Sequence, residues 1–182
     1  MTGADLDELA RAARAGSREA FGAIYDRTRD RLVRVLASYA GPDPMVLEDL
    51  VHDVFVRVAE RLQAYDPQRP FAPWLFTIAL NVGRNHTRSR REELVEREST
   101  RSDPRVATDE ALLAVTDLMR GVSGLPLPLR DVVALRIGSD FGYDEIAELL
   151  DIPAGTARRR MHSAVKILRD REPQSLRTGG RS

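Results

Sequence analysis

The chain has 182 residues, of which 31% are charged and 42% hydrophobic, and its formal net charge is zero. This length suits one medium domain or two small domains with packed cores. The sequence contains no cysteine, which excludes disulfides and thiolate metal sites. Its longest apolar runs hold about four residues, far short of a membrane span, and its first residues lack an apolar stretch of signal-peptide length. We therefore expect a cytoplasmic protein without a membrane span.

The zero net charge conceals two basic blocks in an otherwise acidic chain. Residues 69–91 contain five arginines and no acidic residue, and residues 152–182 contain eight basic and two acidic residues. Residues 92–117, between these blocks, carry a net charge of −5. Two separate basic blocks indicate contact with a polyanion at two places, although helix faces exposed to water would give the same pattern.

Apolar residues at helical spacing predict four helices in the first part of the chain, over about 6–13, 21–39, 47–63 and 73–91. Gly16 separates the first two helices, and Ser17 is a typical N-cap residue. Pro73 is a favourable first residue for the fourth helix. The third helix is predicted to bury one apolar face, made of Leu50, Val51, Val54, Phe55 and Val58.

The charged segment 92–117 is predicted to be a partly disordered linker, with helix returning over about 110–120. Three more helices are predicted over about 129–137, 143–150 and from about residue 156 to 169, with Gly155 or Thr156 as the cap of the last. Residues 173–182 are expected to form a disordered tail. No segment alternates like a strand. The sequence thus predicts an all-α fold of two small helical domains, 1–91 and 118–172, joined by an acidic flexible linker.

The last two predicted helices have the pattern of a helix-turn-helix. Tyr143, Ile146, Ala147 and Leu150 form a stripe, and the small Ala147 would let two helices cross closely. The turn Asp151–Gly155 then leads into an amphipathic helix whose other sides carry Arg158, Arg159, Arg160, His162, Lys166 and Arg169. Such a helix suits phosphates and guanine edges, so these residues favour DNA binding over a helical hairpin with a basic exposed face.

The segment LPLPLRDVVALRIGSDFGYDEIAELLDIPAGTARRRMHSAVKILR resembles region four of extracytoplasmic-function (ECF) sigma factors of bacterial RNA polymerase. The resemblance covers about 45 residues. It implies recognition of the −35 promoter element in the major groove by one helix. The residues expected to contact this DNA are Thr156, Arg158, Arg159, Arg160, His162, Ser163 and Lys166.

Four residues of this segment depart from the family pattern. Asp151 stands where the family usually has glycine, and aspartate tolerates a left-handed turn better than most residues, so we expect the turn to survive. Ala157 replaces valine and offers less apolar area to the core, and Met161 replaces leucine. Arg159 replaces serine, so the base preference of the family does not carry over.

The first part of the chain resembles region two of the same family. The matching segments are LEDLVHDVFVRVAERLQAYDP and PFAPWLFTIALNVGRNHTRSRR, and the resemblance covers roughly residues 20–91. It implies that the helix from Pro73 and the loop before it, about 65–71, capture the opened −10 element. Leu80 replaces a usual arginine, which removes one phosphate contact. The expected contacts are Phe71, Trp74, Thr77, Asn81, Arg84, Asn85 and Arg88.

Helical spacing supports a separate polar side on this helix. Leu75, Ile78, Ala79 and Val82 make a core face, whereas Trp74 and the amide and arginine residues cluster elsewhere. A ring, amides and arginines together suit single-stranded DNA. Core packing is the alternative interpretation of Trp74.

The third helix needs a different partner because its acidic residues Glu48, Asp49, Asp53 and Glu60 would repel DNA. The resemblance implies that this segment docks on the β′ coiled coil of core RNA polymerase, and that the chain also contacts the β subunit. Asp49, Asp53 and Arg57 are the expected polymerase contacts. A solvated face around a buried stripe is the alternative.

No catalytic site is evident in the sequence. His52, His86 and His162 are isolated, and neither a phosphate loop nor a nucleophile elbow is present, so we expect no enzyme, no metal and no cofactor. A metal-dependent nuclease using Glu48, Asp49 and Asp53 is a remote alternative. The main alternative is a stand-alone helix-turn-helix regulator that works without polymerase. The family resemblance also implies an anti-sigma factor as a further expected partner.

Overall fold

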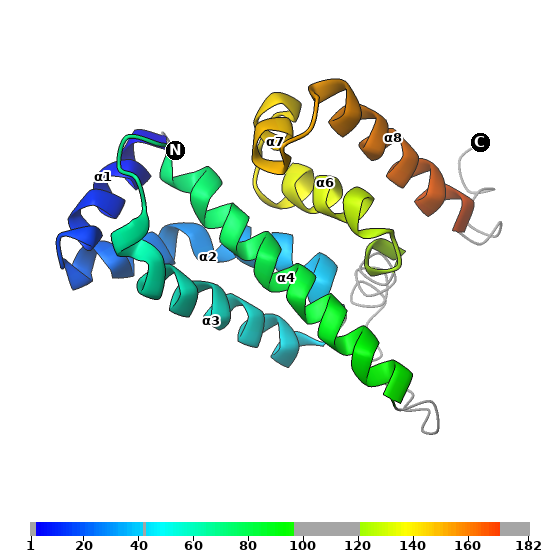
Figure 1. The fold of residues 1–182 in the computed structure, drawn as a ribbon, viewed down its shortest axis with the longest axis horizontal. Helices are drawn as coiled ribbons and strands as arrows, with labels where there is room; N and C mark the ends of the chain where they lie inside the picture. The colour runs from blue at the N-terminus through cyan, green and yellow to red at the C-terminus, as the bar shows by residue number, and fades with distance from the viewer. Residues whose placement is uncertain (1–2, 42, 97–120, 172–182) are drawn as a thin grey trace, which may run out of the picture.

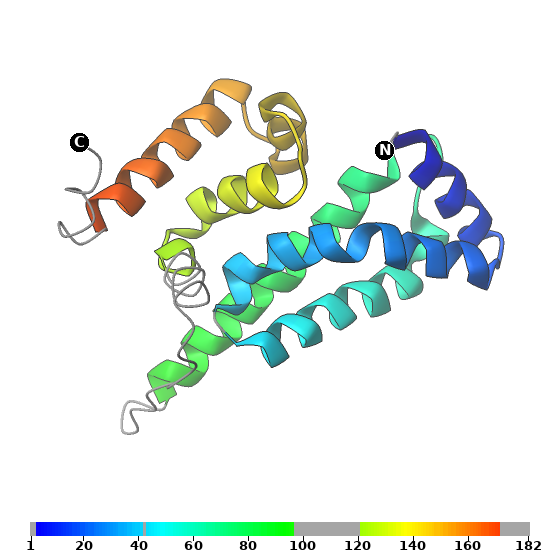
Figure 2. The same cartoon turned by 180° about the vertical axis from the view of Figure 1, so that it is seen from behind.

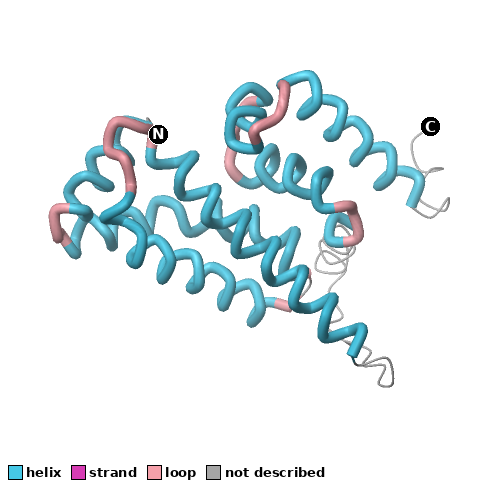
Figure 3. Tube along the Cα trace, viewed as in Figure 1, coloured by secondary structure: helices cyan, strands magenta, loops and turns pink. Residues whose placement is uncertain are grey.

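The computed structural model describes residues 3–41, 43–96 and 121–171. Within those ranges every regular element is a helix, which confirms the predicted all-α fold (Figure 3). Most of the predicted linker, the helix expected over about 110–120 and the expected tail lie outside the described residues. Below, residues 3–96 are called the N-terminal half and residues 121–171 the C-terminal half.

The N-terminal half contains α1 (Gly3–Arg14), α2 (Arg18–Ala40), α3 (Pro44–Arg61), the short 3-10 helix η1 (Leu62–Ala64) and α4 (Phe71–Glu96). Ser17 caps α2 as predicted, because its Oγ accepts a 3.1 Å hydrogen bond from the Ala20 N–H. Helix α3 begins earlier than predicted because Asp43 caps it, accepting a hydrogen bond from the Met45 N–H. Helix α4 also begins earlier, at Phe71 rather than near Pro73.

The C-terminal half contains α6 (Leu127–Gly138), α7 (Tyr143–Leu150) and α8 (Ala154–Arg171). Asp151 ends α7 at φ 52°, in the left-handed region, so the turn survives without glycine as expected. The predicted cap of α8 is wrong, because Gly155 and Thr156 lie inside the helix. The Pro153 carbonyl instead accepts hydrogen bonds from the N–H groups of Thr156 and Ala157, which moves the start of α8 to Ala154.

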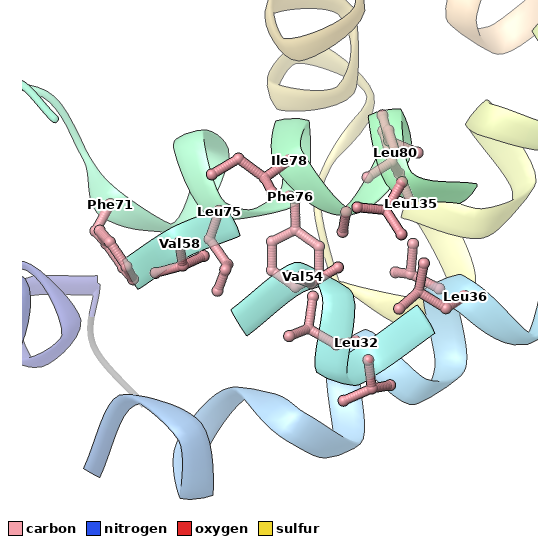
Figure 4. Close-up of a cluster of buried hydrophobic side chains, with 14 of the residues drawn as sticks. Leu32, Leu36, Val54, Val58, Phe71, Leu75, Phe76, Ile78, Leu80 and Leu135 are labelled. Carbon is pink, nitrogen blue, oxygen red and sulfur yellow. The ribbon is translucent and has the colours of Figure 1, made fainter. Parts of the chain in front are cut away.

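A bundle of α1 to α4 encloses the main core, and the predicted apolar face of α3 is buried in it. Figure 4 shows Val54 and Val58 of α3 beside Leu75 and Phe76 of α4 and above Leu32 of α2. The core continues into the C-terminal half through residues that include Leu135, Phe141 and Ile146. A smaller cluster, made of Val122, Leu125, Val133 and Ala164, belongs to the C-terminal half alone.

The two halves lie against each other in both views of the ribbon (Figures 1 and 2). Helix α6 packs on α2 and α7 touches α4, whereas α8 packs on α6 and α7 at the far side. This arrangement places α8 at the outside of the molecule, with its length exposed on the side away from the N-terminal bundle.

Candidate nucleic-acid interface

Helices α7 and α8 form the helix-turn-helix that the sequence predicts. The Gly142 N–H donates to the Glu145 carboxylate at 2.7 Å, which closes the first turn of α7. The Ile152 N–H returns to the Ala147 carbonyl at 2.9 Å, and Ala147 is buried where the helices cross. Ala157 and Ala164 are fully buried on the inner face of α8. Small side chains on both helices therefore allow close packing and fix the direction of α8.

The outer face of α8 carries the residues expected at the −35 element. Arg158, Arg159, His162, Ser163 and Lys166 are exposed, and Thr156 and Arg160 are partly buried. The Arg158 guanidinium lies 3.6 Å from the Asp144 carboxylate and 5.7 Å from the centre of the Tyr143 ring, so it leans back on α7. Arg159 donates a 3.2 Å hydrogen bond to Thr156 Oγ1 near the start of the helix. Arg159 is thus the more outward of the two.

Helix α4 has three distinct faces by the 100° spacing of helical residues. The predicted core face is buried in the bundle, as expected from the sequence. A second face turns toward the C-terminal half and consists of Phe76, Leu80, Arg84 and Thr87. The third face is exposed and consists of Thr77, Asn81, Asn85 and Arg88, four of the residues expected at the −10 element.

Phe71 does not belong to the exposed face, and this corrects a sequence expectation. Its side chain is 0% exposed, and its spacing from Leu75, Ile78 and Val82 places it on the core face. Its ring packs 5.2 Å from Tyr65 and 5.4 Å from Trp74, measured between ring centres, and its N–H donates to the Asp7 carboxylate. Phe71 therefore supports the partly buried Trp74 ring and offers no surface to a base in this structure.

Arg84 is also placed differently from the sequence expectation. Its Nη2 lies 2.7 Å from Oδ2 of Asp131, a buried residue on α6, and its Nε donates to the same oxygen at 3.1 Å. Partial burial opposes the charge of Arg84, but the hydrogen bonds and the charge of Asp131 outweigh it and raise the arginine pKa. Arg84 is therefore engaged in an ion pair with Asp131 of the C-terminal half. Sequence reasoning missed Asp131 because no local pattern marks a partner 47 residues away.

The outer face of α3 carries the residues expected to contact polymerase. Asp49 and Asp53 are exposed one helical turn apart, Arg57 is partly buried one turn further on, and neither acid forms an ion pair within the described residues. Glu48, in contrast, is paired with Arg29 at 2.5 Å. Two large apolar side chains are exposed on the same helix, Met45 at 76% and Val56 at 41%. Acidic residues beside exposed apolar ones make this face suitable for a protein partner.

A groove with a cavity volume of about 1410 Å³ lies between the halves. One wall carries Arg27, Arg31 and Arg34 of α2, and the other carries Asp140, Glu145 and Glu148. Trp74 and Thr77 also line it. In the described part of the chain, no group of three or more histidine, aspartate or glutamate side chains is placed to hold a metal ion. None of the described helices combines the length and the apolar character that crossing a membrane requires.

Two family models match the chain, in the order that the sequence predicts. The model of sigma-70 region 2 matches residues 24–93, and that of sigma-70 region 4 matches residues 116–168. Among curated proteins, the ECF sigma-E factor of Escherichia coli is 27% identical over 177 residues, which cover 88% of this chain and 90% of the relative. The ECF sigma factor SigW of Bacillus subtilis is 26% identical, with coverage of 85% and 89%. The chain is an ECF-type sigma factor of the sigma-70 family.

Solved structures agree with this family. The sigma factor is similar to CnrH, solved in complex with the cytosolic domain of CnrY, with a TM-score of 0.70, 26% identity and coverage of 91% and 96%. The Bartonella quintana sigma factor RpoE, in complex with the anti-sigma factor NepR, shares the fold at a TM-score of 0.61 and 22% identity. The sigma factor is a promoter-recognising transcription initiation factor, and members of its family are transcription factors rather than catalysts.

Proposed function

We propose that three surfaces of this sigma factor have separate binding roles in transcription initiation. The exposed face of α8 reads the −35 element, the exposed face of α4 binds the opened −10 element, and the outer face of α3 binds core RNA polymerase. In this assignment residues 1–91 form region two, residues 92–117 connect the domains, and residues 118–172 form region four. The chain binds and separates strands in the cytoplasm and carries out no catalysis itself.

The exposure and charge of α8 support its role at the −35 element. Exposed arginines near the start of a helix in a helix-turn-helix can reach guanine edges, and the positive end of the helix dipole favours nearby phosphates. Arg159 is the best candidate for a base contact because its only hydrogen bond within the described residues is a local one to Thr156. Lys166, further along α8, suits a phosphate contact.

The exposed face of α4 supports binding of single-stranded DNA. Asn81 and Asn85 offer both donors and acceptors to unstacked bases, and Arg88 can hold the backbone. Trp74 borders this face with a ring held by Tyr65 and Phe71. Trp74 therefore belongs to the proposed site. Phe71, which the sequence predicts as a base contact, instead supports the Trp74 ring from the core side.

Two protein partners follow from the remaining surfaces. The acidic and apolar face of α3 fits a basic, partly apolar surface, and the family resemblance assigns that surface to the polymerase β′ subunit, with a further contact to β. An anti-sigma factor is the second partner. Two similar sigma factors were solved with a bound protein, CnrH with the cytosolic domain of CnrY and RpoE with the anti-sigma factor NepR, and this supports the assignment.

Run-off transcription with core polymerase tests the proposal when the templates are DNA fragments from the genome that encodes this sigma factor. A sigma factor should yield transcripts whose start sites share two upstream elements, and it should co-purify with core polymerase in stoichiometric amount. A stand-alone helix-turn-helix regulator would bind duplex fragments without polymerase and yield no specific transcript. That second pattern would replace the proposed function by the alternative.

A further inference from the structure

Helix α1 is bonded to the chain on both sides of the loop 65–70. Just before the loop, Gln63 of η1 donates a 2.8 Å hydrogen bond to the Arg14 carbonyl, and the Arg14 Nε donates to the Gln63 carbonyl at 3.3 Å. Just after the loop, the Phe71 N–H donates to the Asp7 carboxylate at 2.7 Å. Helix α1 lies beside the loop in both views of the ribbon (Figures 1 and 2). It therefore braces the loop across its two ends.

The bond from Asp7 serves a helix start that its own sequence does not cap. A helix leaves its first N–H groups without an acceptor in its own backbone. The residue before α4 is Pro70, whose side chain has no oxygen and cannot act as an N-cap. The Asp7 carboxylate supplies the acceptor from 64 residues away, and its negative charge is favourable at the positive end of the helix dipole. Asp7 thus stabilises the start of α4 at Phe71.

The capped residue also holds the aromatic rings beside the proposed −10 face. The Phe71 ring contacts both Tyr65 and Trp74, and the centres of those two rings lie 5.2 Å from each other. The Tyr65 hydroxyl donates to the Arg69 carbonyl inside the loop. Burial and then the nearby charge of Asp7 raise the pKa of Tyr65, so the carboxylate also lies close to this ring. A displacement of Phe71 would therefore move the Trp74 ring and the loop together.

The core fixes the direction of the Asp7 carboxylate. Leu6 and Ala10, its neighbours on α1, are 3% and 0% exposed in the main core, and Asp7 itself is partly buried. Asp5 and Glu8 on the same helix are exposed. Asp7 therefore differs from these two acids in being aimed at another helix, and Glu8 provides a matched control for the loss of its charge.

We propose that Asp7 is a positioning residue for the opened −10 element. By capping α4 from α1, it holds the loop 65–70 and the Trp74 ring in the shape that receives unstacked bases. Asp7 itself does not touch DNA and acts through Phe71. A loop that is already ordered costs less conformational entropy when the strand binds. The inference rests on the proposed function of the α4 face, and it gives α1 a role in promoter opening.

The fluorescence of Trp74 tests the positioning in the free chain, without DNA or polymerase. Trp74 is the only tryptophan in the sequence, so its emission reports on this place alone. Asp7→Ala should shift the emission to longer wavelength, because a ring released from Tyr65 and Phe71 meets more water. Asp7→Asn keeps an acceptor oxygen and should restore the natural emission. Glu8→Ala should leave the emission unchanged, and an unchanged emission in Asp7→Ala would overturn the proposal.

DNA binding by the holoenzyme tests whether this positioning serves the −10 element. The two probes are a single-stranded oligonucleotide with the −10 element of a promoter mapped by run-off transcription, and a duplex with its −35 element. Asp7→Ala should weaken binding of the single strand about fivefold, the effect of losing one helix cap, and should leave duplex binding unchanged. Asp7→Asn and Glu8→Ala should bind both probes like the natural chain. Equal losses for both probes in Asp7→Ala would indicate general destabilisation and overturn the proposal.

Failure of this inference can be distinguished from failure of the proposed function. A natural holoenzyme that binds neither probe counts against the proposed function, and with it against the role of Asp7. If the natural chain binds both probes and Asp7→Ala binds the single strand equally well, only the role of Asp7 is overturned. Should Asp7→Ala lose its helical signal in circular dichroism, Gln63→Ala replaces it. Gln63 is exposed and belongs to the other end of the brace, so single-strand binding should weaken, and unchanged binding contradicts the proposal.

Discussion

The carboxylate of Asp131 on α6 lies 2.7 Å from the guanidinium of Arg84 on α4, and 47 residues separate the two in sequence. Asp131 is buried, whereas the Arg84 side chain is 38% exposed. Removing the acid leaves a partly buried arginine and the Tyr39 hydroxyl without their partner. Breaking such a pair from one side costs more than the pair contributes, because the remaining group stays desolvated.

Asp131→Ala should therefore lower the free energy of unfolding by about 1–3 kcal/mol. Urea unfolding followed by circular dichroism measures this change. Asp144→Ala is the control, since Asp144 is exposed and lies 3.6 Å from Arg158. Its loss should cost less than about 1 kcal/mol. Equal costs for the two variants would mean that the buried pair contributes no more than a surface one.

Tyr39 should make stability fall at high pH. Burial, followed by the nearby charge of Asp131, raises its pKa well above 10.0, so the folded protein favours the neutral hydroxyl. A group with a raised pKa contributes fully below its unfolded value and loses that contribution as pH rises toward the folded value. The stability advantage of the natural chain over Tyr39→Phe should thus be constant below pH 10 and shrink above it. Unfolding curves that stay parallel above pH 10 would contradict this assignment.

Arg159→Ala should weaken binding to the −35 element by about 1–3 kcal/mol and relax the preference at one base pair. Arg158→Ala should weaken it less, because Arg158 leans toward Asp144 and Tyr143. Fluorescence anisotropy with the holoenzyme and a set of single-base variants measures both effects. Arg11→Ala on α1 removes the same charge far from α8 and should leave affinity and preference unchanged. A uniform loss across all base variants would make Arg159 a phosphate contact.

Asn81→Ala should impair promoter opening more than initial promoter binding. Asn81 is exposed, so its loss does not disturb the core, and in the proposed role its amide bonds to bases that have left the duplex. Permanganate footprinting reports the opened strands, and gel shift reports the closed complex. Ser89→Ala, exposed on the same helix, should behave like the natural chain. A normal bubble with Asn81→Ala would remove this residue from the −10 face.

Reversal of charge on α3 should weaken the polymerase complex without altering the fold. The double variant Asp49→Arg with Asp53→Arg should reduce the affinity for core polymerase by at least about tenfold. Loss of a close charge pair at a protein interface typically costs that much binding free energy or more. Surface plasmon resonance at two salt concentrations measures the effect. Glu8→Arg, exposed on α1, is the control for added positive charge. The same loss in both would show that total charge matters rather than this face.

Local features of this fold could be predicted from the sequence. Ser17 caps a helix, the residues Tyr143–Leu150 form one, and Asp151 holds a left-handed turn, because each depends on neighbours in the chain. The predicted apolar face of α3 is buried for the same reason: helical periodicity and burial are linked. The predicted cap of α8 was wrong because a proline carbonyl accepts the first hydrogen bonds there.

Contacts between the halves could not be predicted in the same way. The family resemblance implies a DNA contact for Phe71 at the end of the loop 65–71, but α4 begins at this residue and the core stripe of the helix includes it. The family pattern alone marks Leu80 only as a lost phosphate contact. Phe76 and Leu80 do lie one turn apart and off the core stripe, which is the sequence signal of a second apolar contact face. Nothing local identifies Phe141 as the partner of Phe76, or Asp131 as the partner of Arg84.

The core shared by the two halves gives their contact a thermal signature. Separation of the halves transfers Phe76, Leu80, Leu135 and Phe141 toward water, and exposure of apolar surface raises the heat capacity. The free energy of separating the halves must then vary with temperature along a curve, so the contact is strongest at an intermediate temperature and weaker on both cooling and heating. In this sigma factor, temperature alone would change how often the two halves come apart.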